Sequence, residues 1–211
     1  MAEPIYTPTP RTTHRRKKAR GTHGVSSVHD ILDEGFVCHL GFVHDGSPYV
    51  FPTSYAREGD VLYLHGAAAN FALRTLAAGA EVCVTVTLID GLVLAKSAFH
   101  HSVNYRSVMV FGRAEAVTEP TEKARAAAAI VDHIVPGRSR DCRLPTDEEL
   151  RATLIVKVPT SEASAKVRAG GPIDDAEDVE LQHWSGVLPL RTVAEAPEDA
   201  PGYVQSWRVT R

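Results

Sequence analysis

The chain has 211 residues and a mass of 22.9 kDa, which is enough to bury one hydrophobic core. Its composition is that of a soluble globular protein, and no apolar run is long enough to cross a bilayer. A net charge of -3 creates no positive potential that would attract nucleic acid. We therefore expect neither nucleic acid nor, without a long apolar run, a membrane as a partner. The N-terminus lacks the apolar core of a signal peptide, and the three cysteines are widely spaced, which predicts reduced thiols in the cytoplasm.

Residues 1–24 are predicted to form a basic N-terminal arm. Prolines precede a run of arginines and lysines, and few apolar residues anchor the segment. We expect the arm to be flexible or to lie over a surface. Because the basic run is short and lacks interleaved aromatic residues, contact with a ligand phosphate or a partner is at least as good an interpretation as a nucleic-acid tail.

A short helix and a succession of strands follow the arm. Ser26 or Ser27 can cap a helix that runs through Glu34 and ends at Gly35. A second helix is predicted over residues 70–78. Strands are predicted over residues 36–43, 49–56, 61–65, 82–88 and 92–99, with turns at Asp45-Gly46, Gly59-Asp60 and Asp90-Gly91.

The second half begins with a strand that runs from about Tyr105 to Val117. Glu119-Pro120 then starts an Ala-rich helix, and Thr146 with Glu149 forms a capping-box pattern for a brief further helix. Residues 153–158 are predicted to be the last strand. The stripe expected to be buried on the Ala-rich helix consists of Ala127, Ile130, Val131 and Ile134.

These elements predict a mainly β fold with flanking helices, a small closed or split barrel. Few strand–helix–strand crossovers occur, which argues against a doubly wound parallel sheet. The barrel is expected over residues 25–160, and residues 161–211 are expected to be a C-terminal extension that packs on it.

The most informative segment gathers hydrogen-bond donors and a cation where a strand begins. It contains His100, His101, Tyr105, Arg106 and Ser107. Polar groups cost free energy when they are buried without partners, so a purely structural strand end rarely collects so many. The pattern favours a polar, anionic ligand lying across a β-sheet. The alternative is a solvated strand end with a satisfied core histidine.

Three further features admit two interpretations each. Pro52 lies within a predicted strand, which indicates either an edge strand or a bulge that frees backbone groups for a ligand. His65-Gly66-Ala67 leads into a helix near Asn70, which suits an anion but also a simple tight turn. Trp184 could cover a ligand ring or pin the tail to the barrel. The ten histidines show no zinc-ligand spacing, so no metal site is expected.

Four segments together resemble a known family. They are PTSY at 52–55, GDVLYLHGA at 59–67, NYRSVMVFG at 104–112 and WSGVLP at 184–189. In this order and spacing the chain is similar to the pyridoxamine 5'-phosphate oxidase-like flavoproteins, and more narrowly to the nitroimidazole-resistance (Nim-type) reductases. The likeness runs from about Arg11 to about Pro189.

The resemblance implies an FMN-binding split β-barrel that forms a homodimer, with FMN at the subunit interface. It also implies three groups of FMN contacts. The ring and ribityl chain would meet Pro52, Thr53, Ser54 and Tyr55; the phosphate would meet His65, Gly66, Ala67, Asn70 and Arg74; and the neighbouring strand would supply Tyr105, Arg106, Ser107 and Val108, with Trp184 closing the site.

We therefore expect an FMN-dependent oxidoreductase that reduces a small organic acceptor, with a nicotinamide cofactor or another electron donor. His100, His101 and Tyr105 are candidate catalytic residues because their side chains can transfer protons. Family members that oxidise pyridoxamine phosphate end in Arg-Leu-x-Pro, whereas this chain ends with residues 206–211, SWRVTR, which argues against the vitamin B6 reaction. The alternatives are a non-catalytic flavin-binding or storage protein, or a related split barrel that uses haem or a deazaflavin.

Overall fold

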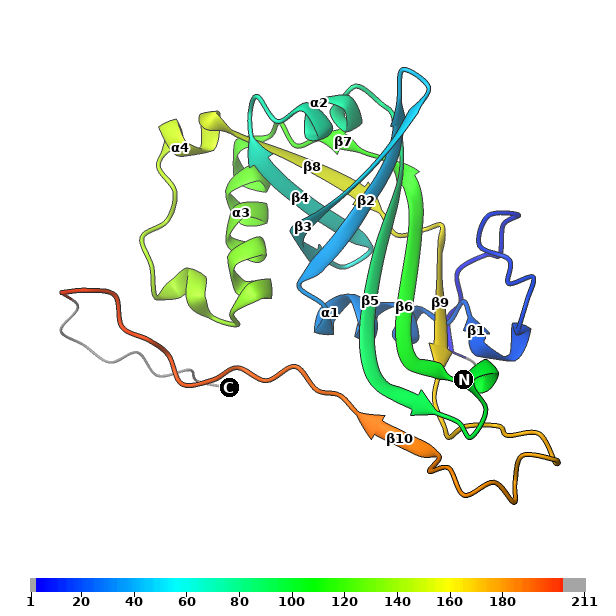
Figure 1. The fold of residues 1–211 in the computed structure, drawn as a ribbon. Coiled ribbons are helices and arrows are strands. Elements are labelled where there is room, and N and C mark those ends of the chain that lie inside the picture. The colour runs from blue at the N-terminus through cyan, green and yellow to red at the C-terminus, as the bar shows by residue number, and fades with distance from the viewer. Residues whose placement is uncertain (1–2, 203–211) are drawn as a thin grey trace.

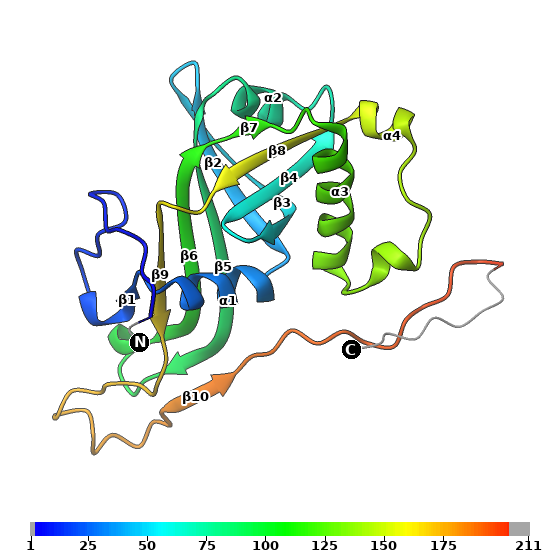
Figure 2. The ribbon, with the colours of Figure 1, turned by 180° about the vertical axis from the view of Figure 1, so that it is seen from behind.

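A computed structural model of the chain describes residues 3–202, so the C-terminal hexapeptide lies outside the described residues. It shows a barrel of antiparallel strands with helices around it (Figures 1 and 2). The strands are β1 (Gly21–Thr22), β2 (Val37–His44), β3 (Ser47–Glu58), β4 (Val61–Ala67), β5 (Glu81–Leu94), β6 (Ser102–Arg113), β7 (Glu115–Ala116), β8 (Thr153–Pro159), β9 (Ala163–Arg168) and β10 (Gly186–Pro189). The α-helices are α1 (Val25–Glu34), α2 (Phe71–Ala77), α3 (Pro120–Ile134) and α4 (Asp147–Ala152), and the 3-10 turns are η1 (Lys18–Arg20), η2 (Ala98–His100) and η3 (Arg138–Arg140).

The strands follow one another in the order β1-β9-β6-β5-β2-β3-β4-β8-β7, and β10 pairs with β5. Alternation of side chains explains the sequence pattern: Val82, Val84 and Val86 of β5 are buried, while the residues between them point away from the core. The predicted Asp45-Gly46 turn is confirmed, with both residues at positive φ (47° and 75°) between β2 and β3. The expected mainly β split barrel is therefore confirmed.

The split in the barrel lies along β3. Its residues 47–54 pair with β2, whereas residues 55–58 pair with β4. Pro52 lies opposite His39 of β2 and has no strand on its other side, because β4 joins only at Tyr55. Of the two interpretations of Pro52, the edge strand is confirmed, since pairing with β2 continues in register.

Two apolar cores position the functional surfaces. The larger core fills the barrel and includes Tyr55, Val108 and Val110. A smaller core lies on the other side of β4 and β8, where Ala126 and Ile130 of α3 pack against them. The predicted helix stripe is confirmed only at Ile130, which is buried; Ala127 and Val131 are half-buried, and Ile134 is 48% exposed.

Asp90-Gly91 was predicted to be a turn between two strands, and this is wrong. β5 continues to Leu94, and the irregularity between Ile89 and Gly91 is a β-bulge. Pairing with β6 on both sides of the bulge outweighs the local turn preference of the dipeptide. The chain reverses only after Ser97, at η2.

Residues 153–158 are not the last strand, which is a second correction. β9 joins β6 and β1 in the barrel sheet, and β10 pairs with the end of β5. β9 was missed because Ala163, Ser164 and Ala165 are small residues with little strand preference, although all three are buried against β6.

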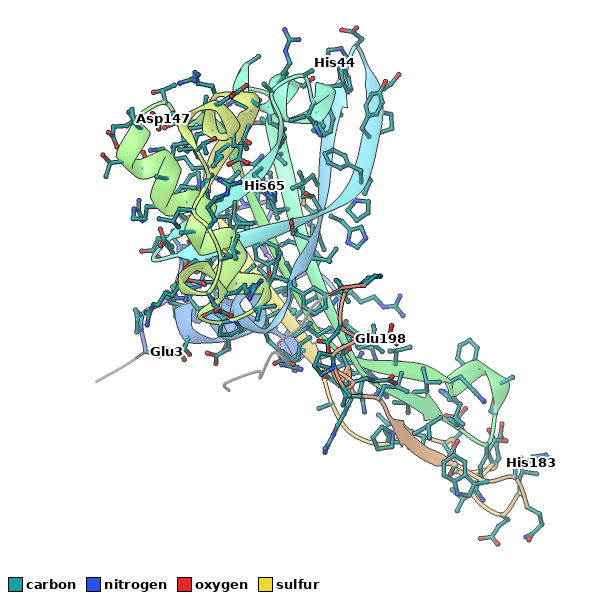
Figure 3. All side chains as sticks on the ribbon, turned by 90° about the vertical axis from the view of Figure 1, so that its left-hand side faces the viewer. Glu3, His44, His65, Asp147, His183 and Glu198 are labelled. Carbon is teal, nitrogen blue, oxygen red and sulfur yellow. The ribbon has the colours of Figure 1, made fainter. Side chains whose placement is uncertain are left out.

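A projection, here called the finger, leaves the barrel at one end. It consists of residues 91–103 and 172–189, in which β10 extends the hairpin of β5 and β6. Figure 3 shows the finger at the lower right, with His183 at its far end. Lys96 ties the two parts together, since its backbone N–H donates to Asp174 at 2.7 Å and its ammonium group donates to the carbonyl of Leu181 at 2.6 Å.

The N-terminal arm lies over the barrel, one of the two expected arrangements. Tyr6 is buried, and its hydroxyl group contacts Thr160 at 2.9 Å and His29 at 2.9 Å. Ile5 also forms a bridge with Gly24. Cys38, Cys83 and Cys142 are all free. Within residues 3–202, each helix is too short or too polar to pass through a bilayer.

Candidate functional site

Two cavities mark the candidate sites, and both lie outside the barrel core, against different strands. The first opens on the outer face, the side of β3, β2, β5, β6 and β9 that points away from the barrel core. In the paired strands one row across this face is Pro52, His39, Thr85, Met109 and Ser164, and an adjacent row contains Thr87, Ser107 and Lys166. The face therefore offers hydroxyl groups and a cation beside apolar side chains.

The N-terminal arm borders this face and forms the first cavity, here called the arm cavity. It has a volume of about 550 Å³ and lies between residues 10–16 and the strands β6 and β9. Arg11 holds the arm in place: its guanidinium group lies 5.0 Å from the ring centre of Phe111 and pairs with Glu162. The Thr9 hydroxyl donates to the same carboxylate at 2.5 Å.

The arm cavity is lined by cations that lack a carboxylate partner. Arg15 and Arg16 form no side-chain ion pair with a described residue, and Lys166 donates only to the carbonyl of Arg16, at 3.5 Å. His14 also lines the cavity, and its buried Nε2 has no hydrogen-bond partner among the described residues. Burial lowers the pKa of His14, with the neighbouring His23 adding to the effect, so the imidazole is neutral at pH 7.

The second cavity, here called the helix-side cavity, lies between the barrel and the segment from α3 to α4. It has a volume of about 280 Å³, and its apolar lining includes Ile130, Val131, Leu144 and Leu150. His65 of β4 is the histidine in its lining, and Figure 3 labels it beside α3.

His65 is unusual because it forms no hydrogen bond with any described residue. Its Nδ1 is buried without a partner, and burial lowers the pKa of the ring. The side chain is therefore a neutral imidazole, the form that can ligate a metal. A buried polar group without a partner costs free energy, which is a reason to ask what it binds.

The outer wall of the helix-side cavity is fixed by an ion pair and a helix cap. Arg143 donates to Glu149 at 2.8 and 2.7 Å, and the Thr146 capping box starts α4 as predicted. Hydrogen bonding from Arg143, with help from the Thr146 backbone, lowers the pKa of Glu149 to about 2, so the pair stays charged. Cys142 lies in the same wall.

Strand alternation separates the predicted flavin contacts. Tyr105 and Ser107 of β6 lie on the outer face, as do Pro52 and Ser54 of β3. The intervening residues of the two strands point to the other side; they are Thr53, Tyr55, Arg106 and Val108. Tyr55 is buried, and its hydroxyl donates to the carbonyl of Leu32 at 2.6 Å.

Arg106 is already paired with carboxylates. It donates to Asp90 at 3.0 and 2.7 Å and to Glu34 at 2.7 Å, which joins the bulge of β5 to the end of α1. The Arg106 hydrogen bonds lower the pKa of Glu34. The structure thus gives this guanidinium group a bridging role, while its contact with a flavin stays a prediction.

The predicted phosphate contacts form the turn into α2. Asn70 caps the helix, with its side-chain oxygen accepting from the N–H of Leu73 at 3.1 Å. A Cβ at Gly66 would come within 2.9 Å of Leu73, so the glycine permits close packing of strand and helix. Ala67 ends β4 and Arg74 lies on α2. The segment therefore forms the tight strand-to-helix turn that the sequence analysis gave as one interpretation. Phosphate binding at this turn stays a prediction.

The finger carries the remaining predicted residues. His100 contacts Asp175 at 2.9 Å and His101 contacts the carbonyl of Ser97 at 3.0 Å, both at the reversal between β5 and β6. Trp184 is 66% exposed beside Gly186 and so does not pin the tail into the barrel. Among the described residues, no cluster of three or more His, Cys, Asp or Glu side chains could hold a metal ion.

The sequence interpretation missed Lys166 and the helix-side cavity. Lys166 belongs to the unpredicted β9, and the lining of the helix-side cavity comes from segments distant in sequence. The basic run of the arm was the available signal for the arm cavity, since a ligand phosphate was one of its interpretations.

Comparisons with known proteins give a consistent set of relatives. The flavocytochrome Anf3 from Azotobacter vinelandii is 37% identical, with a TM-score of 0.87 over 93% of this chain and 91% of that one. An FAD and haem binding protein from Mycobacterium smegmatis is 35% identical, with a TM-score of 0.83 over 88% and 91%. A candidate 5-nitroimidazole antibiotic resistance protein from Bacteroides thetaiotaomicron is 26% identical, with a TM-score of 0.59 over 70% and 86%.

A search of curated proteins finds no match. The family described as pyridoxamine 5'-phosphate oxidase matches residues 25–167, more than half of the chain and most of its barrel. The fold and this match agree with the resemblance drawn from the sequence motifs. The chain belongs to the pyridoxamine 5'-phosphate oxidase family.

Proposed function

We propose that this chain is an oxidoreductase that binds a flavin on the outer face and a haem in the helix-side cavity. The proposal extends the haem alternative of the sequence analysis and keeps its oxidoreductase activity. Two relatives that span nearly the whole chain support it, since one is a flavocytochrome and the other binds FAD and haem. The observation that carries it is His65, a neutral imidazole without a partner in a largely apolar cavity.

The residues of the helix-side cavity fit a haem. His65 would hold the haem through its iron, and the apolar side chains of Ile130, Val131 and Leu144 would exclude water from the haem. Arg143 lies in the wall and could approach a haem carboxylate. When bound, the haem would supply one-electron chemistry, which the protein tunes through the ligand and the apolar walls.

The outer face fits a flavin. Thr85 and Ser107 can hydrogen-bond to the ring edge, and Met109 offers apolar cover. We propose FAD rather than the FMN expected from the sequence motifs, since the Mycobacterium smegmatis relative binds FAD. A nicotinamide donor and a small organic acceptor stay the proposed substrates, in the cytoplasm.

A second candidate is a Nim-type, FMN-dependent reductase without haem. The 26% identical relative, a candidate nitroimidazole resistance protein, favours it. The candidate groups for proton transfer would then be those that the sequence predicts, His100, His101 and Tyr105. The absorbance spectrum separates the two candidates, because only a haem protein shows a Soret band.

The test is the spectrum of the purified full chain, expressed with a supply of haem precursor. We expect a Soret band together with flavin bands. His65→Ala should abolish the Soret band and retain the flavin bands, while His183→Ala, on the exposed finger, should keep both. Flavin retention also shows that the variant is folded. A Soret band of wild-type size in His65→Ala would refute the assigned ligand, and a flavin spectrum alone in the wild type would favour the second candidate.

A further inference from the structure

The arm cavity brings together basic side chains from two distant parts of the chain. Arg15 and Arg16 come from the N-terminal arm, and Lys166 comes from β9. The Lys166 ammonium group donates to the carbonyl of Arg16 across 150 positions of sequence. The cations therefore converge because the arm folds over the sheet.

Their charges are not balanced within the described residues. Arg11, also in the lining, pairs with Glu162 and lies 3.6 Å from Glu81. Both carboxylates near the cavity are therefore paired with Arg11 and not with Arg15, Arg16 or Lys166. The lining of the cavity contains no carboxylate. Three positive charges at one cavity repel one another, and an anion placed among them would relieve the repulsion.

Neutral groups in the lining also suit an anion. Ser107 and Ser164 contribute hydroxyl groups from the strands, and a hydroxyl group can donate to an anion. The arm is held at several points before the cavity, by Tyr6 and by Thr9 on Glu162, so these groups are arranged by the fold. The cavity, at about 550 Å³, exceeds what a single phosphate group needs.

We propose that the arm cavity binds the phosphate chain of a dinucleotide, with Arg15, Arg16 and Lys166 as its cationic clamp. This rests on the proposed function, because a flavin ring on the outer face beside Met109 and Ser107 would lie next to the cavity that these residues also line. Two dinucleotides share this chemistry. One is the flavin cofactor itself, whose phosphates would then lie in the arm cavity rather than at the turn into α2, and the other is a nicotinamide electron donor. The phosphate chain, rather than the ring, is what the arm recognises.

The test uses the flavin-depleted full chain and compares Arg16→Ala/Lys166→Ala with wild type. Titrations with FAD, FMN and riboflavin separate the phosphates from the ring, and a titration of the flavin-loaded protein with NADPH tests the second source. Because the double variant loses charged hydrogen bonds to the phosphates, we expect it to weaken FAD binding by about tenfold or more and to leave riboflavin binding unchanged. Arg191→Ala, an exposed cation of the C-terminal segment, is the matched control and should change neither.

The outcomes distinguish the two proposals. A selective loss of FAD affinity assigns the cavity to the flavin, and a selective loss of NADPH affinity assigns it to the donor. Equal losses for FAD and riboflavin, or no loss for any ligand, would overturn the clamp while leaving flavin binding intact. A wild-type protein that binds no flavin would overturn the proposed function; the clamp would then stand only if NADPH binding depended on Arg16 and Lys166.

Discussion

At the scale of single residues, His65 shows how burial prepares a side chain for ligation. The ring is half-buried and gains no hydrogen bond among the described residues, so its charged form is disfavoured and its pKa falls below the usual 6.5. As the pH falls, His65 is therefore protonated at a higher pH in the unfolded chain than in the folded one. The contribution of neutral His65 to stability is fully present above pH 6.5 and is lost as the pH falls through the lower folded pKa.

The lowered pKa of His65 leads to a prediction of how the haem-loaded protein responds to pH. Protonation of His65 competes with ligation, so we expect the Soret band to decline only when the pH falls through the lowered pKa of His65, below 6.5, while the flavin remains bound. Parallel titrations followed by absorbance and by circular dichroism check it, with His183→Ala expected to follow the wild-type curve. If the Soret band persists until the secondary structure itself is lost, the ligand is a group other than His65.

At the scale of elements, Arg106 connects α1 to the bulge of β5. Its guanidinium group serves Glu34 and Asp90 together, and bidentate pairs in a network are stronger than isolated surface pairs. We expect Arg106→Ala to lower the free energy of unfolding by about 1–2 kcal/mol. Urea unfolding measures this, and Arg113→Ala, which removes an exposed pair with Glu81, should change stability much less.

The same variant tests the sequence prediction that Arg106 binds the flavin. Loss of flavin without loss of stability would show that the guanidinium group acts on the cofactor and not as a bridge. Loss of stability with flavin content unchanged would show the reverse. Both quantities can be measured on one preparation.

Local patterns predicted most of the strands, because residues 82–88 and 105–111 alternate regularly and Asp45-Gly46 is a strong turn. Asp90-Gly91 shows the limit: the dipeptide favours a turn, but pairing of β5 with β6 turns it into a bulge. Neither cavity could be located from the sequence, since each depends on contacts distant in sequence. His65 lines the same cavity as Leu144 with no local signal, and the basic run of the arm indicated a ligand phosphate but not the contact of Arg16 with Lys166.

At the scale of the molecule, exposed apolar side chains are the reason to propose a partner. Val50 on the outer face is 70% exposed, and Phe99 and Trp184 on the finger are 88% and 66% exposed. Isolated apolar residues on a surface are ordinary, but these lie on the sheet face and on a projection that contributes no residue to either apolar core. A second copy of the chain would cover both, which supports the homodimer expected from the resemblance.

We therefore expect light scattering to report twice the 22.9 kDa chain mass for the wild type. Val50→Asp/Phe99→Asp should give a folded monomer that retains less flavin, because a charge in a buried interface is costly and the partner would complete the outer-face site. Ile134→Ser, which changes an exposed apolar residue at the end of α3, should remain dimeric. A wild-type protein that is yellow and monomeric would exclude a flavin site shared between subunits and would confine the cofactor to the outer face and arm cavity of a single chain.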